Sequence, residues 1–201
     1  MDHPKTLAIH RYWTELRGAR AAPTRSEVDP RRIAEALDSM FILEATREGG
    51  FRFRLAGTAL CDLMGMEARG MVVETLMTDA HGAEIAELAR RVLATPGVGL
   101  MRVRGDDAEG EEWSGEALLL PLRSEFGDLD RVMGCVAMFG ATRRRRPAGP
   151  LRLRCLGARL DTIEAGESGP AAPRARARPF EAEPTATGGF GETGVLLTPD
   201  L

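Results

Sequence analysis

Alternating apolar and polar residues predict a β-hairpin in the first third of the chain. Residues 41–45 are mostly apolar, and residues 51–55 read FRFRL, so that arginine alternates with phenylalanine and leucine. A period of two is typical of a strand with one buried face. Gly49 and Gly50 lie between the two runs and can supply the positive φ angles that tight hairpin turns need. The pattern therefore predicts two short antiparallel strands.

A helical repeat of apolar side chains precedes this hairpin, over residues 6–17. Ile9, Tyr12, Trp13 and Leu16 follow i, i+3, i+4, i+7 spacing, which places them on one stripe of a helix. A helix of this length is marginal in isolation. We therefore expect the stripe to pack against another part of the fold.

Start and stop signals predict three further helices. Asp29, followed by proline, makes a cap and first turn for a helix that runs to about Asp38. Gly57 is expected to take a positive φ angle where the second strand ends and a short helix begins. The longest helix begins at residues 78–79, keeps helical spacing of its apolar residues, and ends at the Thr-Pro-Gly sequence of residues 95–97.

Three strands are predicted in the second half, over residues 98–104, 114–123 and 131–139. Residues 132–139 and 117–120 are apolar at both parities. A strand that is apolar on both faces has to be covered on both faces. The long helix covers one face in this interpretation, and the N-terminal stripe is the candidate cover for the outer face, within the chain or from a second copy. A homodimer through the N-terminal helix is the preferred interpretation.

The composition changes after residue 139. Residues 143–146 are four consecutive arginines, which could bind an acidic partner or nucleic acid. A solvated linker is the preferred interpretation, because no aromatic residues are interleaved and the whole chain is slightly acidic. A weak strand or helix is expected within 151–164, and residues 166–201 are expected to be disordered, although the last eight are apolar enough to dock. The expected organisation is an N-terminal helical cap, a central domain, an arginine-rich linker with a weak C-terminal element, and a tail, over residues 1–39, 40–140, 141–165 and 166–201.

Charge and cysteine content narrow the class of protein. With 27 Lys and Arg against 30 Asp and Glu, the net charge is −3, which disfavours a general nucleic-acid binder. Cys61, Cys135 and Cys155 are widely spaced, so we expect reduced thiols rather than disulfides or a zinc site. The sequence has no apolar run long enough for a membrane span and no signal-peptide pattern, so the expected location is the cytoplasm.

No catalytic motif occurs in the sequence. A phosphate-binding loop, a dinucleotide fingerprint and the GxSxG and HExxH motifs are all missing. A group of carboxylates is expected to solvate a loop rather than to catalyse a reaction; it comprises Asp106, Asp107, Glu109, Glu111 and Glu112. We therefore expect no enzymatic activity and no metal site.

Two segments resemble a known family. The run FRFRLAGTALCDLMGMEARG and the upstream WTELRGARAAPTRSEVDPRRI are similar to the PAS-type family (PAS_5-like) that is common as short stand-alone proteins in alphaproteobacteria, over about residues 10–140. The resemblance implies an α+β PAS fold. Its five-stranded antiparallel sheet would carry short helices on one face, with the N-terminal amphipathic helix as an addition. It also implies sensing or protein interaction rather than catalysis.

The PAS layout implies an apolar cavity beneath the long helix, although a solid core without a ligand is the alternative. The candidate lining residues are Phe53, Leu55, Leu60, Met64, Leu76, Leu88, Val92, Leu118, Leu120 and Met138. Haem ligation through His81 is disfavoured because a single histidine specifies little. A flavin adduct is excluded because residues 72–76 contain no cysteine. The cofactor stays unknown, and none is expected.

These observations lead to one functional expectation. The chain is expected to be a non-catalytic sensor or signalling protein that binds a small ligand or a protein partner and acts on a separate effector. A constitutive adaptor without a ligand is the alternative. Membrane and nucleic-acid partners are not expected.

Overall fold

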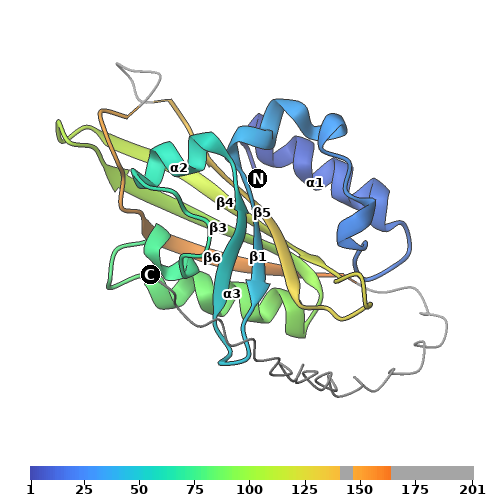
Figure 1. Cartoon of the computed structure of the whole chain (residues 1–201). Coiled ribbons are helices and arrows are strands. Elements are labelled where there is room, and N and C mark those ends of the chain that lie inside the picture. The colour runs from blue at the N-terminus through green and yellow to red at the C-terminus, as the bar shows by residue number, and fades with distance from the viewer. Residues whose placement is uncertain (141–146, 164–201) are drawn as a thin grey trace, which may run out of the picture. The chain divides into compact units, whose positions relative to one another are not determined.

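The computed structural model describes residues 1–140 and 147–163. Its centre is a six-stranded antiparallel sheet in the order β2-β1-β5-β4-β3-β6 (Figure 1). The strands are β1 (Met40–Ala45), β2 (Phe51–Ala56), β3 (Gly97–Asp106), β4 (Glu112–Leu122), β5 (Arg131–Met138) and β6 (Arg154–Thr162). The α+β class is confirmed, and a sixth strand extends the five-stranded sheet that was expected.

Helices cover both faces of this sheet (Figure 1). They are α1 (Pro4–Arg17), η1 (Arg25–Glu27), η2 (Pro30–Ser39), α2 (Thr58–Met64), η3 (Val73–Leu76) and α3 (Gly82–Ala94), where η marks a 3-10 helix. The helix predicted from Asp29 is present as η2, and the Asp29 side chain accepts a hydrogen bond from the Arg31 amide at 3.0 Å. No helix within the described residues is long and apolar enough to cross a membrane.

Two apolar cores lie on opposite sides of the sheet. The inner core joins the sheet to α2, η3 and α3, and Ile85, Leu88 and Val92 of α3 are buried in it. The outer core joins the sheet to α1 and η2, and Ile9 and Trp13 are almost completely buried there. The two-sided apolar character of β4 and β5 therefore has the predicted explanation, since each face is covered.

A β-bulge in the β1–β2 pair changes the face of one predicted core residue. Leu43 is opposite Phe53, whereas the preceding residue, Ile42, is opposite Leu55, so Arg54 is the extra residue of β2. Because an extra residue reverses the alternation of side chains, Leu55 does not join the inner core and is 37% exposed.

Gly57 corrects another expectation. Its φ angle is −74°, so it does not take the predicted positive value. A Cβ atom at this position would lie 2.3 Å from the carbonyl oxygen of Asp38 and 2.4 Å from that of Leu37. Glycine is required here by the close approach of η2 rather than by backbone conformation.

The described residues that lead into β6 cross the inner side of the fold. We call these residues, 147–153, the strap. The Leu151 amide donates to the Leu63 carbonyl of α2 at 2.7 Å, and the Thr78 amide donates to the Leu153 carbonyl at 2.8 Å. The strap leads into β6, so the weak element expected over 151–164 is a strand. The arginine run at 143–146, predicted to be a linker, and the tail at 166–201, predicted to be disordered, lie outside the described residues.

Candidate functional site

Six of the ten predicted cavity residues meet in the inner core. They come from β2, α2, η3 and α3, and all are at most 7% exposed; they are Phe53, Leu60, Met64, Leu76, Leu88 and Val92. Met138, at the end of β5, is partly buried and packs against the same core. The sequence therefore placed these candidates in one contiguous apolar region. A ligand cavity among them stays a prediction.

Three of the predicted residues belong elsewhere. Leu118 and Leu120 lie in the outer core, while their neighbour Leu119 faces the inner core. Strand β4 is apolar at both parities, so its pattern could not distinguish the two faces. Leu55 is the third, because of the bulge in β2.

The strap supplies two inner-core side chains that were not predicted. Leu151 and Leu153 are 2% and 0% exposed and belong to the inner core. A Cβ atom on Gly65 would lie 2.3 Å from Cγ of Pro150, so the chain of α2 and the strap approach closely. The alternation of leucine with Arg152 and Arg154 was the signal available in the sequence.

A cleft of about 670 Å³ opens between α1, η2, α2, β5 and the strap. His3 and Lys5 line it from α1 and its N-cap, Asp62 from α2, and Met138 from β5. Asp38 of η2 and the adjacent Ser39 complete the polar part of its wall. The cleft therefore combines charged side chains with Met138, which also packs against the inner core.

Lys5, the single lysine of the chain, connects α1 with η2 at this cleft. Its ammonium nitrogen lies 2.6 Å from Oδ1 of Asp38 and donates to Oγ of Ser39 at 2.8 Å. Burial opposes ionisation of Asp38, but the hydrogen bonds that its carboxylate accepts from Lys5 and from the Ser39 hydroxyl keep its pKa below the ordinary value. Burial of the neighbouring His3 ring lowers the pKa of that histidine.

A buried carboxylate fixes the N-terminus of α1. Glu116 of β4 is 0% exposed and accepts hydrogen bonds from the amides of Asp2 and His3, at 3.1 Å and 2.9 Å, and from the Thr6 hydroxyl. Burial alone would raise the pKa of Glu116, but the hydrogen bonds from Thr6 and the two amides lower it below its usual value. The sequence offered one indication of this buried carboxylate, a glutamate within a predicted apolar strand.

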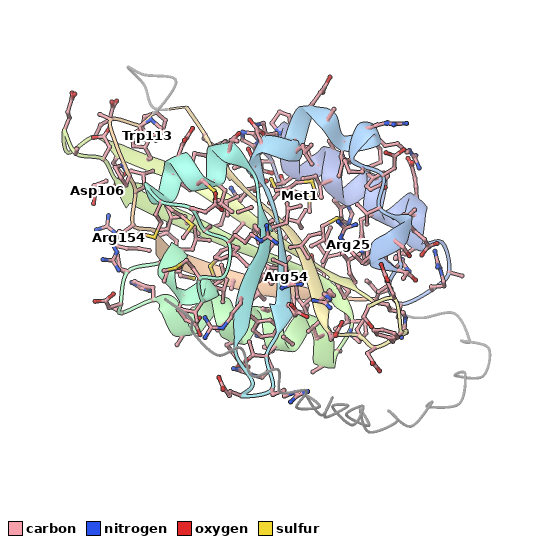
Figure 2. The ribbon with its side chains drawn as sticks, viewed as in Figure 1. Met1, Arg25, Arg54, Asp106, Trp113 and Arg154 are labelled. Carbon is pink, nitrogen blue, oxygen red and sulfur yellow. The ribbon has the colours of Figure 1, made fainter. Side chains whose placement is uncertain are left out.

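The acidic loop between β3 and β4 has a structural role. Asp107 accepts hydrogen bonds from the amides of Glu109, Glu111 and Ala148, and from Nε1 of Trp113. The Ala148 amide makes the largest contribution to lowering the pKa of Asp107 to about 2. The other predicted loop carboxylates include Asp106 and Glu112, which pair with the arginines of neighbouring strands. Figure 2 labels Asp106, Trp113 and Arg154 at this end of the molecule.

His81 lies at the N-cap of α3, and its Nδ1 atom is 2.7 Å from Oε2 of Glu84. Among the described residues, no group of three or more His, Cys, Asp or Glu side chains could hold a metal ion.

The three cysteines are unpaired, and burial raises the pKa of Cys135 to about 12. That thiol is therefore a packing group at neutral pH.

The N-terminal stripe covers the sheet of its own chain. Ile9, Tyr12 and Trp13 are at most 4% exposed, and Leu16 packs at the edge of the outer core. Trp13 donates from Nε1 to the carbonyl oxygen of Pro121 at 2.9 Å. The structure thus shows the alternative in which the cover lies within one chain, and a dimer through this stripe would have to displace α1 from its own sheet. The homodimer itself stays a prediction.

The sequence matches a protein-family model. The PAS_5 model, described as a PAS domain, matches residues 1–137. The search of curated proteins gave no match.

Several solved structures are similar to the chain. The PAS domain of a protein from Colwellia psychrerythraea has 15% identity and a TM-score of 0.41, and the match covers 54% of this chain and 95% of that one. VqmA bound to DPO has 15% identity and a TM-score of 0.40, with 55% and 57% covered. The Vibrio cholera VqmA–ligand–DNA complex has 16% identity and a TM-score of 0.40, with 55% and 51% covered. The chain thus matches slightly more than half of VqmA.

Proposed function

The chain belongs to the PAS-domain family, and on that premise we propose that it is a non-catalytic signalling module that binds a small molecule in the cleft described above. PAS domains are generally sensory. The observation that supports the proposal is the position of the cleft, which is lined by α1 with its N-cap, by η2, by α2 and by β5. A bound molecule would contact the cover of the outer face and a side chain of the inner core at once.

The chemistry of the cleft favours a small polar molecule. Lys5 offers an ammonium group to an anionic oxygen, while Asp38 and Asp62 can accept hydrogen bonds from amine or hydroxyl groups. A ligand that took Lys5 from Asp38 would remove the ion pair that connects α1 with η2. Binding would thereby be coupled to the attachment of the cover helix, which a separate effector protein could detect.

An adaptor without a ligand is the second candidate. The filled inner core supports it, since Leu151 and Leu153 of the strap occupy space beneath the helices and are almost inaccessible. In this case the surface alone would recognise the partner.

Native mass spectrometry of the purified full-length chain distinguishes the two candidates. The sensor candidate predicts a retained small molecule in addition to the 21.8 kDa chain. Ala59→Trp places a large side chain in the wall of the cleft and should abolish retention. Ala83→Trp, on the exposed side of α3, is the matched control and should retain the molecule. A chain that carries no small molecule and shows no thermal shift with a metabolite library would contradict the sensor candidate and favour the adaptor.

A further inference from the structure

Arginines are concentrated around the β1–β2 hairpin. Two hollows of about 360 Å³ and about 380 Å³ adjoin there, and Arg54 lines both of them. Arg25 and Arg54, from distant parts of the sequence, line the second hollow together and are labelled in Figure 2. We call this region the arginine surface; its arginines are Arg25, Arg47, Arg52, Arg54, Arg69 and Arg131.

The arginine surface has a local excess of positive charge in a chain whose net charge is −3. Glu44 and Glu125 are the carboxylates that line the two hollows. Glu44 contacts both Arg54, at 2.8 Å, and Arg131, at 2.5 Å, so one carboxylate serves two guanidinium groups. Asp130 also lies 3.6 Å from Arg131.

Four of these arginines are available for a partner. Across residues 1–140 and 147–163, no carboxylate lies within 4.0 Å of the guanidinium groups of Arg25, Arg47, Arg52 or Arg69. Arg52 donates only to the carbonyl oxygen of Gly70, at 3.0 Å. Each free guanidinium group can bind a carboxylate through two parallel hydrogen bonds.

Two exposed apolar side chains lie beside the arginines. Phe126 is 94% exposed and Leu55 is 37% exposed, and both line the second hollow. The turn that carries Phe126 is held by a hydrogen bond from the Gly127 amide to the Ser124 carbonyl, at 3.0 Å, and by one from the Ser124 amide to Asp128, at 2.7 Å. An aromatic side chain presented on an ordered turn is typical of an interface anchor.

We propose that the arginine surface docks an acidic segment of a partner protein, whose carboxylates bind the free arginines and whose apolar side chain packs on Phe126 and Leu55. Glu44 disfavours a nucleic acid, since a phosphate backbone would meet its carboxylate between Arg54 and Arg131. A protein segment can place a neutral residue there. The inference deepens the proposed function, on which it rests for the existence of a separate effector.

The test uses the full chain and a fluorescent peptide in which glutamates alternate with leucines at helical spacing. Binding is measured by anisotropy at low and high salt. Arg47→Glu combined with Arg69→Glu should weaken binding at least about tenfold, and Phe126→Ser should weaken it independently of salt. The matched control is Arg90→Glu with Arg91→Glu on α3, which changes the net charge equally at two exposed residues. It should leave the affinity within about twofold, because it lies outside the surface.

The outcomes separate this inference from the proposed function. Thermal melting shows that each variant is folded. Equal losses in the two double variants, or no binding at peptide concentrations of about 1 mM, would overturn the docking surface, whatever small molecule the cleft retains. Tighter binding of single-stranded DNA than of the peptide, with the same variant dependence, would also overturn it, since the occupant would then be a nucleic acid.

Discussion

Gly57 lies so close to η2 that a larger residue has no room there. Gly57→Val should lower the free energy of unfolding by about 1–3 kcal/mol, since the added atoms meet two backbone carbonyls that cannot move independently. Urea denaturation measures the change. Gly50→Val is the control, because the nearest atom to its Cβ is the Thr46 hydroxyl at 3.6 Å, and it should stay within about 0.5 kcal/mol of the wild type. Equal losses in both variants would contradict the close approach.

Asp107 should make stability depend on pH in the acidic range. Its folded-state pKa of about 2 is below the ordinary value of 3.8, so its contribution is fully present above pH 3.8 and is lost as the pH falls through about 2. In Asp107→Asn an amide N–H₂ group would face two donors in either orientation: Nε1 of Trp113 and the Ala148 amide, or the amides of Glu109 and Glu111. The variant should be less stable than the wild type at pH 7, and the difference should shrink between pH 3.8 and about 2.

Urea titrations over that pH range provide the measurement for Asp107. Asp79→Asn, at a carboxylate 97% exposed, controls for the loss of one negative charge. A stability difference for Asp107→Asn that is the same at every pH would show that the carboxylate is not the stabilising form.

The sequence alone was sufficient to predict the position of some side chains and not of others. The alternation in FRFRL placed Phe53 in the inner core, because one face of that strand is polar. It failed for Leu55, since no residue pattern announces a bulge whose position depends on the partner strand. It failed for Leu118 and Leu120 because both parities of β4 are apolar. The partners of Glu116 could not be predicted either, because they lie more than a hundred residues away.

Helix α1 is a cover rather than an appendage. Ile9→Glu combined with Trp13→Glu would place two charges where the outer core excludes water, and loss of the Trp13 side chain alone costs about 3–5 kcal/mol in typical cores. We expect the double variant to aggregate, as measured by light scattering. Leu7→Glu, on the same helix at a residue 47% exposed, should remain folded. A folded, fully dispersed double variant would contradict the cover.

The strap is predicted to stabilise the inner core through its buried leucines. Leu153→Ala removes a fully buried side chain and should cost about 2–5 kcal/mol in the free energy of unfolding. Leu156→Ala makes the same chemical change on β6, where the side chain is 55% exposed, and should cost far less. Guanidinium unfolding of the two variants gives the comparison. Similar values would show that Leu153 is not part of the inner core.

The long helices could be predicted from the sequence, whereas the burial of the strap could not. The stripe of α1 and the apolar face of α3 repeat over several turns, so periodicity identified both helices. The strap is seven residues without helix or regular strand and contains two leucines. Its burial depends on α2, η3 and β3 being folded around it. Such long-range contacts cannot be predicted from the residues of the strap alone.

At the scale of the molecule, the sheet separates two compartments that are sealed by different ends of the chain. The outer core is closed by α1, which comes first in the sequence, and the inner core is completed by the strap, which comes after β5. The cleft lies where these layers meet, lined by His3 and Lys5 on one side and by Pro147 of the strap on another. A change in the cleft can therefore affect both compartments.

The late position of the strap has a consequence for biosynthesis. A ribosome adds about 5–20 residues per second and releases the N-terminal end first, so α1 and the hairpin emerge well before Leu151 and Leu153. Until those two leucines emerge, the underside of the sheet remains unsealed and open to chaperones. A nascent chain that stalled soon after β5 would hold all of the residues matched by the family model and would still expose apolar surface. The matched region is therefore shorter than the unit that folds.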